Sequence, residues 1–180
     1  MNLTSLKLTL ICLYLFLIPN KLIGNEYPVY NEISAIAVVD QDTLFTQSYG
    51  GKKILEKVET MVSQLASENR KIEKSLEVEE LLLTEKRKTI SSLEFNVFAL
   101  EFDSRVKKIR DQQAKKQIDI NSYLNKSRSK FFERITPILL NFIDELGVVI
   151  LLNKDTVALA SVGSDITQLA ITRINVLLKD

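Results

Sequence analysis

The chain has 180 residues, with 24 Lys and Arg against 23 Asp and Glu, one cysteine and no histidine. The absence of histidine removes the commonest general base and metal ligand, and a single cysteine excludes an internal disulfide or a cysteine cluster for a metal. Carboxylates are plentiful, but they alternate with lysines along predicted helices, as on a solvated surface. The sequence also has no glycine-rich phosphate loop and no calcium loop. We therefore expect no enzymatic activity, no cofactor and no metal site.

The first predicted element is a targeting segment. Lys7 precedes an apolar run of eleven residues at 8–18, which Pro19 ends. A positive charge followed by a short apolar core is typical of a secretory signal peptide, whereas a span of the bilayer needs about 20 residues. We interpret 1–24 as a signal peptide. Because Leu22 and Ile23 stand before Gly24 at the best cleavage site, where alanine is preferred, an uncleaved inner-membrane anchor stays as the alternative.

A short strand and a short helix are predicted before the long central segment. Residues 25–33 are polar and aromatic and suggest a loose lead-in. Residues 35–39 have the sequence Ala-Ile-Ala-Val-Val, which predicts a strand that is apolar, and therefore buried, on both faces. Thr43 is the expected N-cap of a short helix, whose first apolar pair is Leu44 and Phe45.

The central segment, 52–136, contains neither glycine nor proline and lies between Gly50-Gly51 and Pro137. Such a run exceeds the length of a globular helix and predicts a coiled coil, a hairpin or a single rod. Apolar residues recur in it at spacings of three and four, a stripe narrow enough for a two-helix seam. The predicted seam comprises Ile54, Val58, Met61, Leu65, Ile72, Leu76, Leu83, Phe95, Phe98, Phe102, Val106, Ile109, Ile120, Leu124, Phe131, Ile135 and Ile138, interrupted by Glu68, Glu79, Gln113, Lys116 and Ser127.

A helix-start signal lies in the middle of this segment. Ser91 precedes Glu94 by three residues, so the two side chains can form a capping box, in which each accepts a hydrogen bond from the other residue's backbone amide. This predicts two antiparallel arms, near 52–88 and 92–136, joined by a turn near 89–91. The alternative is one straight helix in which Ser91 is an ordinary surface serine.

Charge is unevenly distributed along the chain. Residues 52–136 carry 19 Lys and Arg against 14 Asp and Glu, and 105–134 carry 10 against 3. A basic arm suits anionic partners such as lipid or lipopolysaccharide head groups, although a mixed-charge solvated coil is the alternative. Aromatic residues do not alternate with the cations, so we expect no nucleic-acid binding. The candidate anion- and client-binding residues are Lys107, Lys108, Arg110, Lys115, Lys116, Lys126, Arg128, Lys130 and Arg134.

After the arms, Pro137 is the expected first residue of a new helix, which Gly147 ends as its C′ residue. Residues 148–152 predict a second buried strand, and 156–160 predict a third that returns from a turn as a hairpin. Asp165 is the expected cap of a closing helix.

These elements predict an α+β chain, mostly helical, in which a long antiparallel helical hairpin at 52–136 is inserted into a small β body formed by 25–51 and 137–180. The body has about three strands and is small for an independent core. Since its strands are apolar on both faces, we expect other copies of the chain to cover them in a homo-oligomer. The candidate oligomer residues are Ile36, Val38, Val149, Ile150, Leu151 and Val157.

Several segments, taken in order, match a known family. They are the strand 36–40 with the adjoining Leu44-Phe45, the turn region 83–91, the segment 102–106 and the C-terminal stretches 149–157 and 165–167. With these segments the chain resembles the Skp (OmpH-like) periplasmic chaperones of Gram-negative bacteria. The resemblance implies a homotrimer with a small β body and three helical arms around a cavity, which holds unfolded outer-membrane proteins without ATP.

Two functions follow from these observations. The first is a periplasmic holdase chaperone that binds unfolded outer-membrane β-barrel proteins between its arms and prevents their aggregation. The second is a structural or adaptor coiled coil of the cell envelope that binds one folded partner. Polar residues in the seam favour the first, because they predict bendable arms, whereas a rigid spacer is expected to keep its seam apolar.

Overall fold

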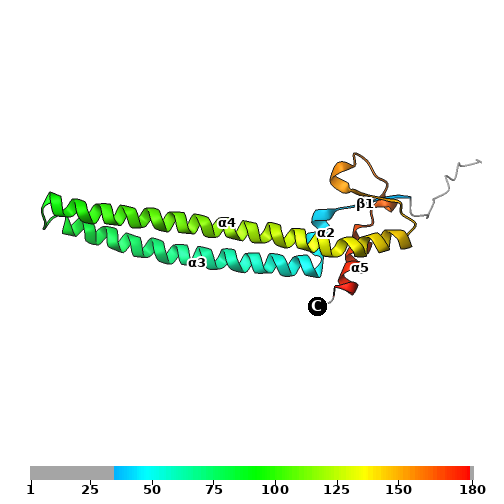
Figure 1. The fold of residues 1–180 in the computed structure, drawn as a ribbon, viewed down its shortest axis with the longest axis horizontal. Coiled ribbons are helices and arrows are strands. Elements are labelled where there is room, and N and C mark those ends of the chain that lie inside the picture. The colour runs from blue at the N-terminus through cyan, green and yellow to red at the C-terminus, as the bar shows by residue number, and fades with distance from the viewer. Residues whose placement is uncertain (1–34, 179–180) are drawn as a thin grey trace, which may run out of the picture. The chain divides into compact units, whose positions relative to one another are not determined.

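The structure, a computed structural model, describes residues 35–178, which belong to one compact unit, Ile33–Asp180. The predicted signal peptide and the whole of the lead-in at 25–33 lie outside the described residues. The elements, in chain order, are β1 (Ile36–Val39), α2 (Gln41–Gln47), α3 (Tyr49–Lys86), α4 (Ser92–Glu145), β2 (Ile150–Asn153), the 3-10 turns η1 (Lys154–Thr156) and η2 (Val162–Ser164), and α5 (Thr167–Leu177). The chain is mostly helical with one small sheet, as predicted (Figure 1).

The two long helices lie side by side and antiparallel (Figure 1). Arg105 donates to Glu79, and eleven residues farther along each helix Lys116 donates to Glu68. Between the helices the Ser91 capping box is present: the Glu94 amide donates to Ser91 Oγ at 3.3 Å, and the Ser91 amide donates to Glu94 Oε2 at 3.2 Å. The hairpin prediction is therefore confirmed, and the straight-rod alternative is wrong.

The sheet has two parallel strands, with Ile36 opposite Ile150 and Val39 opposite Asn153. Parallel neighbours require a crossover connection, and here the whole helical hairpin supplies it. The predicted third strand at 156–160 is wrong, since these residues belong to no strand in the described chain. After the turn η1 the chain passes to the other edge of β1, where the Ile166 amide donates to Val38 O at 3.0 Å.

The short helix α2 begins three residues earlier than an N-cap at Thr43 requires. Asp40 is the cap, and its carboxylate accepts from the Thr43 amide at 2.8 Å and from the Thr43 hydroxyl at 2.7 Å. These two bonds lower the pKa of Asp40 below its ordinary value. The prediction of Thr43 as the cap is wrong. Asp40 is the cap, and Thr43 donates two hydrogen bonds to its carboxylate.

Gly50 and Gly51 lie inside α3 and do not end it, so the first arm begins at Tyr49 rather than at 52. Ser48 caps the helix by accepting from the Gly51 amide at 3.2 Å. A Cβ atom on Gly51 would lie 1.5 Å from the carbonyl oxygen of Phe45. Glycine is needed at 51 because the end of α2 passes directly over the first turn of α3.

Pro137 likewise lies within a helix, because α4 continues unbroken for 54 residues to Glu145. The predicted new helix at 137 is wrong. Proline removes one backbone hydrogen bond, whose acceptor would be the carbonyl of Glu133 four residues earlier. Both residues are exposed, so water can bond to that carbonyl. The arm and the body therefore share one continuous helix.

Gly147 ends α4 as predicted, with φ at +69°. Its amide donates to Asp144 O at 3.0 Å and the next amide, of Val148, donates to Ile143 O at 2.9 Å, the paired bonds of a Schellman motif. At the start of α5, Asp165 lies one residue before the N-cap position, Ile166, and accepts from the Thr167 amide at 3.0 Å. Asp165 therefore accepts a hydrogen bond from the first residue of α5, but it does not occupy the N-cap position as predicted.

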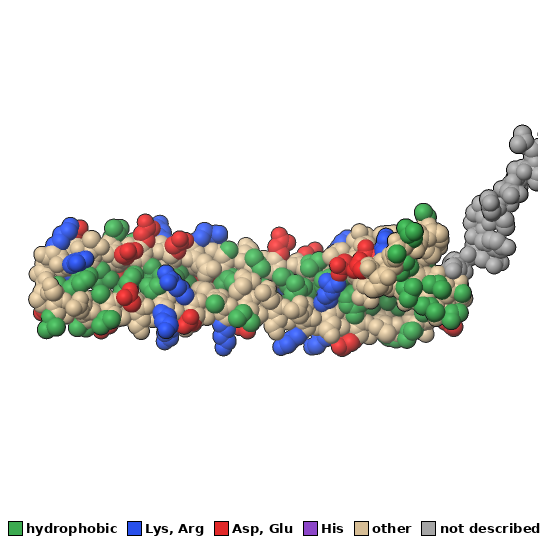
Figure 2. All heavy atoms as spheres, turned by 90° about the horizontal axis from the view of Figure 1, so that it is seen from above, with side chains coloured by type: hydrophobic (Ala, Val, Ile, Leu, Met, Phe, Trp, Pro, Cys, Tyr) green, Lys and Arg blue, Asp and Glu red, His purple; other side chains and the backbone are tan. Residues whose placement is uncertain are grey.

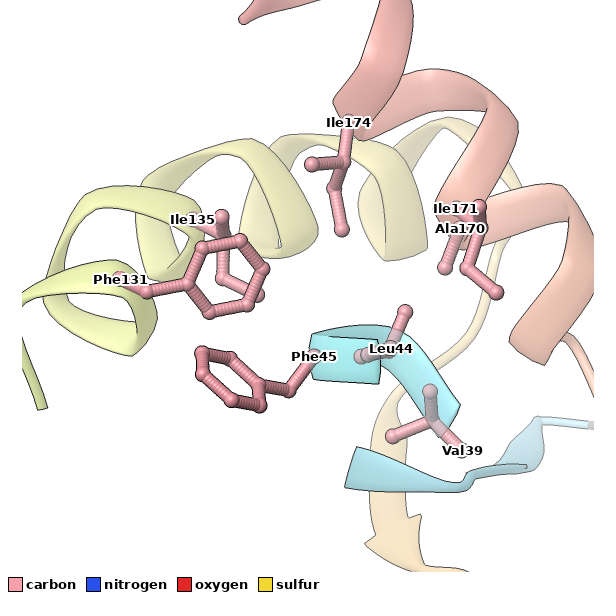
Figure 3. Close-up of a cluster of buried hydrophobic side chains, with 8 residues drawn as sticks. All are labelled: Val39, Leu44, Phe45, Phe131, Ile135, Ala170, Ile171 and Ile174. Atoms are coloured by element: carbon pink, nitrogen blue, oxygen red, sulfur yellow. The ribbon is translucent and has the colours of Figure 1, made fainter. Parts of the chain in front are cut away.

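The main hydrophobic core lies where α2, α4 and α5 meet. Figure 3 shows Phe45 from α2 beside Phe131 from α4, with ring centroids 5.4 Å apart in an edge-to-face arrangement. Ile135 and Ile174 are fully buried beside these rings. The other members of the cluster are Val39, Leu44, Ala170 and Ile171. The root of the hairpin is therefore fixed to the body by one shared aromatic core.

Candidate functional site

The predicted basic residues are spread along the surface of α4 and form no single cluster. With about 100° of rotation per residue, Lys107, Lys108, Lys115 and Lys126 point away from the seam, while the remaining five flank it. All nine except the partly buried Arg128 are exposed. The surface they form is long and dispersed, with no enclosed centre.

Some of these cations are already engaged within the chain. Lys116 and Gln113 both donate to Glu68 across the seam, and these bonds lower the pKa of the Glu68 carboxyl. Arg128 pairs with Asp42 of α2 and lies 5.1 Å from the centre of the Phe45 ring. Arg134 also has an interaction within the chain. Within residues 35–178, no ion pair forms at Lys107, Lys108, Arg110, Lys115, Lys126 or Lys130.

Four of the five polar interruptions of the seam have polar partners on the opposite helix, which the sequence analysis did not predict. Glu68 meets Lys116 and Gln113, and Glu79 meets Arg105. Such pairs fix which residues of two helices lie opposite each other, at some cost in stability. The Gln113 carbonyl oxygen is nevertheless buried without a hydrogen-bond partner among the described residues. The interruptions therefore set the register of the arm as well as loosening its packing.

Exposed apolar side chains near the turn of the hairpin form a second candidate surface, which the sequence analysis missed. Their exposed fractions run from 51% at Val78 to 80% at Leu93. Figure 2 shows hydrophobic side chains on the surface at this end of the hairpin. We call them the distal apolar set: Val78, Leu81, Leu82, Leu93, Val97 and Leu100.

A signal for the distal apolar set was present in the sequence. Its members lie outside the three-and-four spacing of the seam, on both sides of Ser91, and apolar residues off the seam of a two-helix hairpin have no partner helix. Exposed apolar groups of this kind mark interaction surfaces.

The turn end of the hairpin is not basic. Residues 77–101 contain six carboxylates and three cations, Lys86, Arg87 and Lys88. Lys86 Nζ lies 3.3 Å from the centre of the Phe98 ring, and Arg87 lies 5.4 Å from that of Phe95. The third cation, Lys88, pairs with Glu85. At the turn end of the hairpin, exposed apolar side chains are therefore better suited than the cations to bind a partner.

The predicted oligomer residues divide into exposed and covered groups. On the outer face of the sheet, Ile36 and Ile150 are 45% and 47% exposed, and Val149 beside them is 77% exposed. Val38 is buried within the chain, and Leu151 and Val157 are partly buried. Further exposed apolar residues, which the sequence analysis missed, are Leu152, Leu159 and Val162. Val38 lies on the same face as Ile36 and Ile150, so the described part of a single chain leaves this face of the sheet partly exposed.

The described residues contain no group of three or more acidic, histidine or cysteine side chains that is arranged to hold a metal ion. In the same part of the chain, no helix combines the length and the hydrophobicity needed to span a bilayer.

Residues 35–174 match the profile of the family described as outer membrane protein (OmpH-like). Among solved structures, a crystal structure from Caulobacter crescentus, named as that of a candidate outer membrane chaperone (OmpH-like), is similar with a TM-score of 0.73 and 17% sequence identity. The similarity covers 81% of this chain and 86% of that one, and it shows that the two share a fold. No curated protein matches the chain.

Proposed function

The chain belongs to the OmpH-like family, and from this premise we propose that it is an ATP-independent holdase chaperone for unfolded outer-membrane β-barrel proteins. The observation that carries the proposal is the distal apolar set, in which six large side chains face solvent on a hairpin. Exposed apolar side chains away from a folded core are costly for solubility, and they are retained where they bind something apolar. The name given to the Caulobacter crescentus protein agrees with a chaperone role.

The proposed grip consists of many weak contacts. Burying one leucine-sized side chain contributes about 1.5–3 kcal/mol, so a client that covers several of them can be held and later released without fuel. The cations of α4 with no ion pair among the described residues, such as Lys107, Lys108 and Lys115, would add long-range attraction for acidic segments or anionic lipid. This part of the attraction weakens with salt, because exposed charges are screened over about 8 Å at physiological ionic strength.

We also propose that the working form is a homotrimer. Ile36, Ile150 and Leu152 remain exposed on the outer face of a two-stranded sheet, and a second copy is the simplest cover for such a face. The number three comes from the resemblance to Skp. Export through residues 1–24 would place the protein in the periplasm, where unfolded outer-membrane proteins pass.

One observation favours the adaptor alternative. The pairs Glu68–Lys116 and Glu79–Arg105 fix the register of the seam, which suits an arm of defined shape that presents one docking site. In that case a single substitution near the turn would abolish binding, and unfolded proteins would not compete for the site.

Suppression of aggregation distinguishes the two functions. An unfolded β-barrel protein is diluted from urea into the exported form of the chain, and light scattering is followed. The test variant combines Leu82→Ser, Leu93→Ser and Leu100→Ser. The matched control combines Leu169→Ser and Val176→Ser on α5, where the side chains are similarly exposed.

We expect protection by the wild type and the control and a large loss of protection in the test variant. Each of the three substitutions alone should cause a partial loss. If the wild type gives no protection at any ratio, the holdase proposal is wrong. If one substitution alone removes all binding, the adaptor function replaces it.

A further inference from the structure

A hollow of about 600 Å³ lies at the root of the hairpin, where α3 and α4 enter the body. We call it the root hollow. Its volume falls within the range of about 300–1,000 Å³ that is usual for small-molecule sites. The lining residues are Tyr49, Gly50, Lys53, Ile54, Lys57, Tyr123, Ser127, Lys130, Phe131, Arg134 and Leu178. It is separate from the distal apolar set, which lies at the other end of the hairpin.

Helical spacing brings these residues together. On α4, the residues 123, 127, 130 and 134 follow one another at intervals of four, three and four, so they form one ridge along the helix. On α3, Lys53 and Lys57 are four residues apart and face that ridge across the hollow. Ser127, which interrupts the predicted seam, therefore has a place in this wall.

The floor of the root hollow is apolar. Phe131, an otherwise buried residue of the aromatic core, contributes to the lining with Ile54 and Leu178. A Cβ atom on Gly50 would lie 3.3 Å from Cε2 of the Phe131 ring. The missing side chain at 50 thus leaves space above the ring, and any longer side chain there would project into contact with it.

The rim of the root hollow is cationic. Among the described residues that line it, four are Lys or Arg and none is Asp or Glu. Two of the four, Lys53 and Arg134, have interactions within the chain. Elsewhere on the hairpin the seam cations have carboxylate partners, as in Lys116–Glu68 and Arg105–Glu79. Lys57 and Lys130 form no ion pair with any described residue. Like charges around one concave site raise its affinity for an anion.

From the apolar floor and the two rim lysines, Lys57 and Lys130, we propose that the root hollow binds a single-chain anionic amphiphile. Its carboxylate or phosphate head lies between Lys57 and Lys130, where the tyrosine hydroxyls of Tyr49 and Tyr123 add hydrogen-bond donors. Its alkyl chain lies on Phe131 and Ile54. The same chemistry is offered by a free fatty acid or alkyl phosphate and by an anionic lipid of a membrane.

Calorimetric titration of the exported form of the chain tests the site with ligands below their micelle concentration. The probes are dodecanoate and dodecyl phosphate, with the uncharged dodecyl maltoside and inorganic phosphate as controls for the tail and the head alone. We expect one site per chain for both anionic amphiphiles. Binding of either control should be weaker by about tenfold or more, the loss expected for one charge-assisted contact or its apolar counterpart.

Two variants locate the binding. Lys57→Gln with Lys130→Gln should weaken binding by about tenfold or more, whereas Lys71→Gln with Lys74→Gln, which are also exposed on the hairpin, should leave it unchanged. Gly50→Leu should also weaken binding by filling the space above Phe131. Circular dichroism verifies that each variant keeps its helix content, and the surface lysine pair provides the test if Gly50→Leu does not fold.

Two further experiments distinguish the source of the ligand and the role of the alkyl tail. Co-sedimentation with anionic vesicles that depends on Lys57 and Lys130 would identify membrane lipid as the source, and binding of monomers alone would identify a free amphiphile. Equal binding of dodecyl maltoside, equal binding of an acidic peptide, or equal losses in both lysine pairs would overturn the proposal. None of these results alters the aggregation assay, so the two proposals fail independently.

Discussion

The hairpin and the body are stabilised in different ways, although α4 belongs to both. Between the turn and the root, the only buried apolar side chains of the described hairpin are Leu65 and Ile120. The body, by contrast, has a contiguous cluster of eight buried residues with an aromatic centre at Phe45 and Phe131. Apolar packing therefore determines the stability of the body, whereas local caps and cross-seam polar pairs determine the shape of the hairpin.

A cavity of the same kind, made in each region, should destabilise the body more than the hairpin. Phe131→Ala should destabilise the protein by about 3–5 kcal/mol, because the ring is 5% exposed and packs against Phe45. Leu65→Ala, in the seam, should cost about 2 kcal/mol, at the lower end for such a truncation, since the narrow seam can close over the gap. Urea denaturation measures both. Equal losses would show that the hairpin and the body are packed alike.

The junction of α2 and α3 gives a matched pair of substitutions. Gly51→Ala should destabilise by about 3 kcal/mol or more, because its Cβ would lie 1.5 Å from Phe45 O and the two helices would have to separate. Gly50→Ala should be within about 1 kcal/mol of the wild type, since its Cβ meets only the edge of the Phe131 ring at 3.3 Å. Thermal unfolding followed by circular dichroism separates the two. If neither substitution lowers the stability, the close approach of Gly51 to the carbonyl oxygen of Phe45 is contradicted.

Ser91→Ala tests the hairpin's own stabilisation. Loss of the bond from the Glu94 amide to Ser91 Oγ should cost about 1 kcal/mol, the usual value for an N-cap. Ser92→Ala, one residue inside the helix, is the matched control and should have little effect. Hydrogen exchange should show faster opening of the first turn of α4 in Ser91→Ala only. A similar change in both variants would contradict a specific role for the cap.

The body should also respond to acid through Asp165. Burial raises the pKa of this carboxyl, but bonds from Lys154 Nζ at 2.7 Å and from Thr167 outweigh burial and lower the pKa to about 2. Because the ordinary pKa of aspartate is 3.8, the stabilisation is complete above that pH and is lost as the pH falls toward about 2.

Asp165→Asn should therefore reduce stability at neutral pH and flatten its dependence on pH between about 4 and 2. Urea denaturation at several pH values measures the slope. Asp155→Asn is the control, since its exposed carboxylate makes no ion pair within the described residues. An unchanged slope in Asp165→Asn would contradict the role of this group.

The sequence predicts those parts of the fold that depend on residues close together in the chain. The Ser91–Glu94 capping box and the Gly147 helix end are local hydrogen-bond patterns, and both are confirmed. The seam can also be predicted from the sequence, because apolar residues at a spacing of three and four are typical of two helices packed side by side.

The errors arise where distant segments decide the outcome. Pro137 interrupts no helix because the carbonyl it leaves without a partner faces water. Glycine is required at 51 because α2 packs closely against the first turn of α3, and no local sequence pattern predicts this contact. The predicted strand 156–160 is wrong because β2 is followed directly by the turn η1, and the residues that return to the sheet are those around Asp165, which lie beside β1. For the candidate site, the cations were visible in the sequence, but their pairing across the seam and the distal apolar set required the register of the two helices.

Hydrogen exchange with and without a bound client tests the central claim most directly, namely that the turn end of the hairpin holds clients while the body supports it. The exported chain is mixed with an unfolded β-barrel protein, and amide protection is measured along α2, α3, α4 and α5. We predict increased protection in residues 77–101, around the distal apolar set, with α2 and α5 unchanged. Protection confined to the body, or no change anywhere under conditions in which the client stays soluble, would contradict the account.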